Sequence, residues 1–257
     1  MTQLERLNYL ISYLLAEQAR YSDIEIPRNT SDKKRLLRSL MNVRPPRKVS
    51  AEFLKIQDEY LREETRQKGI TNARDLTPVR GKLCLWQGDI TTLKCGAIVN
   101  AANSAMLGCF VPCHGCIDNA IHTYAGVELR AECAEQMRGG SEPTGSARVT
   151  MAYNLPCDYV IHTVGPIVGG RLTDTDCELL ADCYKSCLKA ADDNNIKSIA
   201  FCCISTGEFH FPNERAAEIA IDTVEEYLPK SKIERVIFNV FKDSDLEIYK
   251  RLLASRL

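Results

Sequence analysis

The alternation of short apolar segments with amphipathic segments, from residue 82 to the end of the chain, most constrains the fold. The apolar segments predict strands over 83–87, 97–100, 147–152, 159–163, 198–204 and 235–240. The segments with helical periodicity predict helices over 117–124, 127–137, 177–193, 214–227 and 246–253. Strands that alternate with helices in this way form a sheet that helices cover on both faces. The sequence therefore predicts an α/β fold in three layers, α/β/α.

Residues 1–80 have a different pattern, in which Leu, Arg, Lys and Glu are abundant. Helical periodicity predicts helices here over 3–18, 31–41 and 50–68, with prolines between them. Ser31 and Ser50 stand at the expected helix starts, where a hydroxyl can cap backbone N–H groups. We expect a helical N-terminal extension over 1–80 and one α/β domain over 81–257. The extension is expected to be a scaffold or a regulatory appendage without chemistry of its own.

The composition is that of an ordinary globular protein, since 45% of the 257 residues are hydrophobic and 26% are charged. A net charge of −1 provides no basic field, so duplex nucleic acid is not an expected partner. Charged residues interrupt the periodic leucines of the first 18 positions, and that segment falls far short of a membrane span. We therefore expect neither a nucleic acid nor a membrane among the partners.

The chain has 12 cysteines, which do not read as the disulfide framework of a small secreted domain. No signal peptide is recognisable at the start of the sequence, so we expect reduced thiols and a cytoplasmic protein. Most of the cysteines are expected to be small buried hydrophobic residues, namely Cys84, Cys95, Cys133, Cys177, Cys183, Cys187 and Cys202.

Three further thiols gather with a histidine in one short segment, as Cys109, Cys113, His114 and Cys116, directly before Asp118. Thiolate and imidazole are the ligands that zinc favours. A carboxylate beside a zinc site can move protons, and Asp118 stands at a predicted helix start. The segment therefore predicts a metal ion and an acid or base in one catalytic loop.

Polar residues follow several of the predicted strands, where ligands of such folds bind. Asp89 could accept from an exocyclic amine or a ribose hydroxyl, or cap a helix. Asn100 and Asn103 suit ribose hydroxyls, although a structural turn is an equal alternative. Residues 205–207 can bring backbone N–H groups to an anion, or form an ordinary tight turn. Together these signals predict a binding site at the carboxyl ends of the strands.

The segments that carry these signals are Gly88–Thr91, Ala97–Ser104, Ile117–His122 with Ala125-Gly126, Pro143–Gly145, Val160–Pro166 and Ile204–Gly207 with Phe211-Pro212. Their order and spacing resemble a macrodomain, specifically the MacroD type of ADP-ribose hydrolase, over about 82–254. The resemblance implies a three-layer α/β/α macrodomain with a mixed central sheet, in addition to the helical extension.

The chain departs from the MacroD pattern at 108–115, where that type has a run of glycines. The replacement is similar to the zinc-containing macrodomain branch, whose members also carry an N-terminal helical extension. The pattern of that branch implies Cys109, His114 and Cys116 as zinc ligands, whereas Cys113 falls at a variable position. Three protein ligands leave zinc an open coordination position, as in catalytic sites. Because adjacent residues seldom aim at one ion, we expect Cys113 not to bind together with His114.

The resemblance also implies how ADP-ribose is bound. Asp89 would hold the adenine amine with Ile90 beside it, and Phe241 would stack on the adenine unless it simply packs in the core. The residues implied to cradle the diphosphate are Ser205, Thr206, Gly207 and Phe209.

At the other end of the ligand, the distal ribose would face Asn103 and Asp118, the implied catalytic residues, with Asn100 beside them. Asp118 would activate or orient the nucleophile. His122 lies one turn after Asp118 on the same helix face, and we expect it to have a structural role.

The implied function is the zinc-dependent removal of mono-ADP-ribose from a modified protein side chain, an acidic one joined through an ester. Two alternatives stay open: an ADP-ribose-binding module without turnover, and an O-acetyl-ADP-ribose deacetylase. Zinc macrodomains look linked to a sirtuin-like ADP-ribosyltransferase and a lipoyl carrier protein. The expected partners are therefore ADP-ribose and an ADP-ribosylated protein, such as a lipoyl carrier modified by that transferase.

Overall fold

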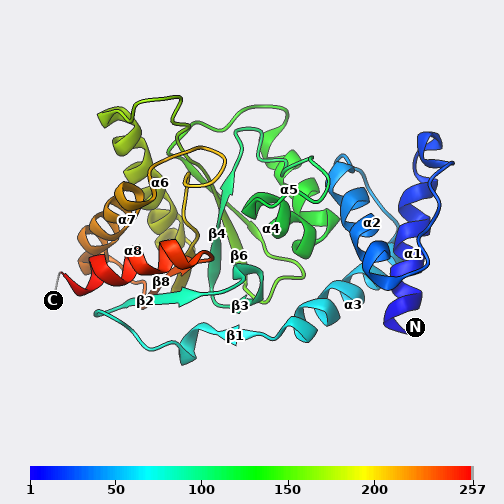
Figure 1. Ribbon diagram of the computed structural model, residues 1–257, viewed down its shortest axis with the longest axis horizontal. Coiled ribbons are helices and arrows are strands. Elements are labelled where there is room, and N and C mark those ends of the chain that lie inside the picture. The colour runs from blue at the N-terminus through cyan, green and yellow to red at the C-terminus, as the bar shows by residue number, and fades with distance from the viewer. Residues whose placement is uncertain (256–257) are drawn as a thin grey trace.

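A six-stranded sheet forms the centre of the molecule in the computed structural model, which describes residues 1–255 (Figure 1). The strands, in sheet order, are β2 (Leu83–Gln87), β8 (Arg235–Val240), β7 (Ser198–Phe201), β4 (Ala97–Ala102), β6 (Tyr159–Val164) and β5 (Ala147–Met151). Neighbouring strands are parallel, except that the edge strand β5 is antiparallel to β6. The predicted mixed sheet is confirmed.

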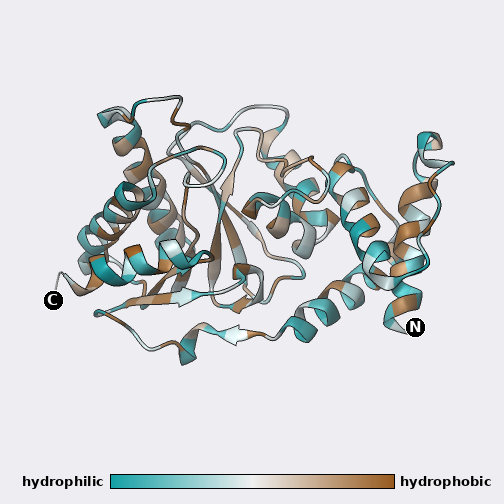
Figure 2. Cartoon of the chain, viewed as in Figure 1, coloured by the Kyte–Doolittle hydropathy of each residue, from teal (hydrophilic) through white to brown (hydrophobic). Residues whose placement is uncertain are grey.

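Five helices of the α/β region cover the two faces of this sheet (Figure 1). They are α4 (Ile117–Ala125) and α5 (Val127–Met137) on one face, and α6 (Asp174–Asp193), α7 (Asn213–Tyr227) and α8 (Asp243–Ala254) on the other. Apolar residues concentrate on the central strands and polar residues along the outer helices (Figure 2). The three-layer α/β/α prediction is therefore confirmed.

The core between the sheet and α6 is built around Tyr184, which is fully buried. Its ring lies 4.9 Å from that of Phe201 on β7, and the ring of Phe238 on β8 lies 5.2 Å from Tyr249 of α8. The cysteines predicted to be buried are buried, with one exception. Cys177 is only half-buried; it lies in the first turn of α6, which begins at Asp174, earlier than predicted.

The strand predicted over 198–204 ends in the structure at Phe201. Cys202 and Ile204 stay buried but leave the sheet and lead into the loop that follows. The apolar run therefore extended the strand prediction too far, since burial without ladder pairing gives the same sequence pattern.

The first three helices are α1 (Gln3–Ala16), α2 (Thr30–Val43) and α3 (Ala51–Lys68). They share their own hydrophobic cluster, in which Leu10, Leu37 and Phe53 are buried. Ser50 caps α3 as predicted, whereas Asn29 rather than Ser31 caps α2. After α3 comes the short strand β1 (Thr71–Asn72), which pairs in parallel with β3 (Leu93–Lys94), a strand that follows β2 in the chain. Within residues 1–255, every helix is too short or too polar to span a lipid bilayer.

A buried arginine joins these helices to the rest of the molecule. The guanidinium of Arg130 on α5 donates to the carbonyls of Met41, Asn42 and Arg44 at the end of α2. It also donates to the carbonyl of Leu107, 2.6 Å away, at the start of the cysteine-rich segment. Because a buried guanidinium needs several acceptors, this contact fixes α2 and that segment to one point of α5.

Candidate active site

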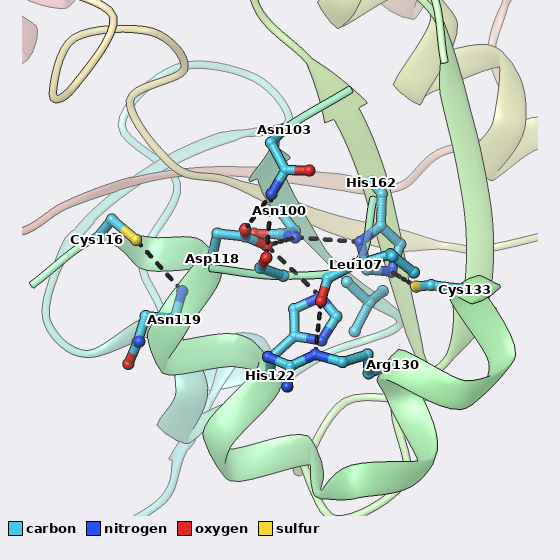
Figure 3. A network of polar contacts seen from close by, with 12 residues as sticks. Asn100, Asn103, Leu107, Cys116, Asp118, Asn119, His122, Arg130, Cys133 and His162 are labelled. Carbon is cyan, nitrogen blue, oxygen red and sulfur yellow. Dashed lines mark hydrogen bonds and ion pairs between the residues drawn. The ribbon is translucent and has the colours of Figure 1, made fainter. Parts of the chain in front are cut away.

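The carboxylate of Asp118 lies at the start of α4 and is 5% exposed. Asn100 donates to its Oδ1 at 2.8 Å, and Asn103 donates to its Oδ2 at 3.3 Å (Figure 3). Asn100 belongs to β4, and Asn103 follows that strand directly. The structure thus brings the two predicted catalytic residues and Asn100 together at the carboxyl end of a central strand.

A buried histidine sets the orientation of the Asn100 amide. The Nδ2 of Asn100 lies 3.1 Å from Nδ1 of His162 on β6, and Nε2 of His162 lies 2.9 Å from the hydroxyl of Thr150 on β5. Burial lowers the pKa of His162 to about 3, so the ring is neutral at ordinary pH. Its Nδ1 then accepts from the amide, which leaves the other amide hydrogen for Asp118. The sequence alone gives no signal for this role, because a single histidine within a strand is usually only packed in the core.

Burial raises the pKa of the Asp118 carboxyl to about 6, against the opposing effects of Asn100, the Arg130 charge and Asn103. The ring of His122 is also fully buried, with Nε2 3.5 Å from Oδ1 of Asp118 (Figure 3). A Cβ at Gly108 would lie 2.7 Å from that ring, and Gly108 has a φ of +78°. His122 therefore packs directly beneath the start of the cysteine-rich segment, which fits its expected structural role.

The three predicted zinc ligands come together in this loop. One ligand atom each of Cys109, His114 and Cys116 lies within 4.8 Å of the others, and Cys109 Sγ is 3.6 Å from Nδ1 of His114. Nε2 of His114 points to the carboxylate of Glu208, 3.5 Å away. A metal-binding histidine commonly uses its second nitrogen in this way. Cys113 points elsewhere, toward the hydroxyl of Ser39 at 3.2 Å.

Helix α2 holds the backbone of this loop. Asn42 accepts from the backbone N–H of Cys113 at 2.9 Å, and Arg38 donates to the carbonyl of His114 at 3.0 Å. Arg38 also donates to the side chain of Asn119, whose amide in turn donates to the carbonyl of Val111. The extension therefore takes part in positioning the predicted metal ligands, although no site residue was predicted in it.

The predicted diphosphate loop follows β7 and lies against the loop after β6. A Cβ at Gly165 would come within 2.0 Å of the hydroxyl of Ser205, so only glycine allows this approach. Ser205 has a φ of +65° and a buried hydroxyl that has no partner among the described residues. Phe209 accepts from the backbone N–H of Val168 at 2.9 Å, and Gly207 is exposed. The loop therefore has a left-handed residue at Ser205 and lies close against Gly165 of the neighbouring loop.

The predicted adenine end lies where β2 and β8 finish side by side. Asp89 caps the short helix Ile90–Thr92 by accepting from the N–H of Thr91, which is the alternative role considered for it. Its second oxygen binds Lys68 of α3 at 3.0 Å. Phe241 follows β8 and is 77% exposed. Its core-packing alternative is therefore wrong, and its ring is free to stack on a ligand.

Comparison with known proteins places this arrangement in a class. The sequence profile of the Macro domain family matches residues 99–220. A Trypanosoma brucei macrodomain solved in complex with ADP-ribose has a TM-score of 0.66 and 30% identity, over 84% of this chain and 94% of that one.

Two curated relatives match over almost their full length. A protein-ADP-ribose hydrolase of Treponema medium is 57% identical over 99% of this chain and 100% of its own. One of Staphylococcus aureus (strain MRSA252) is 50% identical over 95% of this chain and 94% of its own. The chain belongs to the macrodomain family.

Proposed function

We propose that this macrodomain is a protein-ADP-ribose hydrolase, which releases mono-ADP-ribose from a modified protein side chain. The names of its relatives support the activity. The observation that carries the proposal is the buried Asp118 carboxylate, which lies next to a Cys–His cluster. Two asparagine amides bind this carboxylate, from residues 18 and 15 positions before it in the sequence. A protein that only binds ADP-ribose needs no acid or base at this place.

The ADP-ribose is proposed to lie along the carboxyl edge of the sheet. The adenine binds beside Asp89 and Ile90 and under Phe241, and the distal ribose reaches Asn103 and Asp118. The diphosphate lies against the loop of Ser205, Thr206, Gly207 and Phe209. The paired ends of β2 and β8 and the loop after β7 all meet at this edge, which supports the placement. These contacts supply orientation as well as affinity.

The reaction is proposed to be hydrolysis of an ester between C1″ of the distal ribose and a carboxylate side chain. The Asp118 carboxylate takes a proton from the attacking water, whose oxygen bonds to C1″ while the bond to the side-chain oxygen breaks. The products are free ADP-ribose and a restored acidic side chain. Asn100 and Asn103 hold both oxygens of Asp118, so the carboxylate cannot rotate away from the ribose.

Zinc is the proposed cofactor, with Cys109, His114 and Cys116 as its ligands. Two sulfurs and one nitrogen within 4.8 Å fit zinc, and Glu208 beside Nε2 of His114 fits the surroundings of a ligand. When bound, zinc would supply positive charge that polarises a ribose hydroxyl or water. Cys113 turns toward α2, which favours three protein ligands over four.

A time course of ADP-ribose release from a glutamate-modified protein tests the proposal. The expected result is multiple turnovers that stop when a chelator removes zinc and resume when zinc is restored. Binding of ADP-ribose without release would identify a binding module instead. Release from O-acetyl-ADP-ribose alone would identify a deacetylase.

The physiological substrate is proposed to be a cytoplasmic lipoyl carrier protein that a sirtuin-like transferase has modified. The support is the likeness of the 108–116 segment to the zinc-containing branch, and the twelve free cysteines agree with a reducing compartment. Release from the modified carrier, set against release from an unrelated modified protein, tests this choice.

A further inference from the structure

A hollow lies between the N-terminal helices and the α/β region. It has a volume of about 400 Å³ and is walled by α2, α3, α4 and the segment around Cys113. We call it the extension groove and define it by Arg35 and Arg38 of α2, Tyr60 of α3, Cys113, and Tyr124 of α4. This volume falls in the range of ligand sites and would take two or three side chains.

The floor of the extension groove is apolar and its rim is cationic. Leu37, Met41 and Leu61 line it together with the two tyrosines. Three cationic side chains stand against one carboxylate, that of Glu64, which pairs with Lys34 at 2.6 Å. The groove is thus positive although the whole chain carries a net charge of −1.

The two arginines of the groove differ in whether their guanidinium groups already have acceptors within the protein. Arg38 is held by the His114 carbonyl and the Asn119 amide, which are neutral acceptors. Arg35 is exposed, and no ion pair joins it to a carboxylate of the described residues. Its charge is therefore available to an acidic group that enters the groove from solvent.

The extension groove borders the predicted metal loop. Cys113 forms part of its wall, His114 is the next residue, and Arg38 contacts both the groove and the His114 carbonyl. On α4, Thr123 and Tyr124 face the groove, whereas Asp118 and His122 face the sheet. The groove and the predicted site therefore lie on different faces of α4, and the segment of Cys113 and His114 joins them.

We infer that the extension groove holds the segment of the ADP-ribosylated protein next to its modified residue, and that this segment carries an acidic side chain and an apolar one. The inference rests on the proposed function. The acidic side chain would pair with Arg35, and the apolar one would lie on the floor with Tyr60 and Tyr124. In this arrangement the α/β region binds the ADP-ribose, and the extension groove binds the modified protein.

The test uses Arg35→Glu and an ADP-ribosylated glutamate peptide that has a neighbouring aspartate and leucine. KM for this peptide should rise about tenfold or more with kcat unchanged, since an attraction becomes a repulsion at the rim. A matched peptide with lysine in place of the aspartate should be bound better by Arg35→Glu than by the wild type. Arg74→Glu, an exposed charge reversal outside the groove, should leave all values unchanged.

Two measurements separate the groove from the ADP-ribose site. The Kd of free ADP-ribose, measured by calorimetry, should be the same for Arg35→Glu and the wild type. The Kd of the modified peptide should show the tenfold loss also in an Asp118→Ala background, where no turnover is needed.

Equal peptide affinity for Arg35→Glu and the wild type would overturn the groove assignment while leaving the hydrolase proposal intact. A loss that extends to free ADP-ribose would also overturn it, because Arg35 would then act on the ligand site. Failure of the wild-type protein to release ADP-ribose from any modified peptide would overturn the proposed function. The peptide Kd in the Asp118→Ala background would still decide the groove.

Discussion

The acid and the proposed metal ligands lie in one site but are supported by different parts of the molecule. Asp118 is almost fully buried. Its partners lie on β4 (Asn100) and directly after it (Asn103), with His162 of β6 behind Asn100. Cys109, His114 and Cys116 are half-buried, and their loop is held by polar contacts from α2. The sheet therefore fixes the carboxylate, whereas the extension fixes the loop.

This difference predicts that the two halves of the site can be damaged separately. A change beside Asp118 should alter turnover without loss of metal, because the hydrogen bonds of Asp118 involve none of the predicted metal ligands. A change in the extension should alter metal affinity with little effect on adenine and diphosphate binding.

The largest effect is expected for Asp118→Ala. Release of ADP-ribose should fall about 100- to 10,000-fold, the range for loss of a general base. The Kd of ADP-ribose and the zinc content should change little, because other residues provide them. Calorimetry and a release assay on one preparation measure both. Unchanged turnover would remove Asp118 from the mechanism.

Cys116→Ser and Cys113→Ser form a matched pair for the metal loop. Elemental analysis should find about one zinc per chain in the wild type and in Cys113→Ser, and much less in Cys116→Ser. The reason is that Cys113 points to Ser39 and away from the cluster. Loss of zinc from Cys113→Ser would show that the three-ligand assignment is wrong.

Asp89→Ala should weaken ADP-ribose binding about ten- to hundredfold, the effect of a charge-assisted hydrogen bond worth about 1.5–3 kcal/mol. A loss of about 1 kcal/mol in stability should accompany it, since Asp89 also caps a short helix. Asp75→Ala, at an exposed aspartate, is the control. Destabilisation with unchanged affinity would leave Asp89 only its capping role.

Asn42→Ala tests whether the extension supports the metal loop. Its side chain accepts from Cys113 and donates to Thr123, so its loss should lower zinc affinity about tenfold. Asn8→Ala, an asparagine of the same extension that contacts Lys33 instead, should not. Equal zinc affinities for the two variants would contradict the division of support described above.

In His162→Gln, the free energy of unfolding is expected to depend less on pH than in the wild type. The folded-state pKa of His162 is about 3, below its usual 6.5, so only the unfolded state gains a proton between these values. Acidification in that window therefore costs the wild type stability. The free energy of unfolding should fall more steeply in the wild type than in His162→Gln, by about 1.4 kcal/mol per pH unit. Parallel curves between pH 6 and 4 would contradict a neutral buried ring.

The α/β architecture could be predicted because each strand and helix carries its own local periodicity. The residues at which helices and strands begin and end were harder to predict. Asn29 and Ser31 are both good capping residues, and only the backbone of Asn29 takes the extended conformation that a cap needs. Cys202 and Ile204 are buried without joining the sheet, so their apolar character misled the strand prediction.

Some site residues could likewise be predicted from local motifs, whereas their contacts with distant segments could not. The loop of thiols and the strand-end asparagines are visible as local motifs, and the structure places them together. The contacts of Lys68 with Asp89, Glu208 with His114, and Arg38 with Asn119 join segments 21 to 94 positions apart. No single segment signals such a pair, because each partner alone is an ordinary polar or charged side chain.

The contacts of Arg130 have a consequence for protein engineering. Its guanidinium binds the Leu107 carbonyl at the start of the metal loop and three carbonyls at the end of α2. The loop is therefore not a cassette that can be grafted onto a macrodomain without the N-terminal helices. A chimera that received residues 107–116 alone would lack the acceptors that hold Arg130, and would inherit the ligands without their geometry.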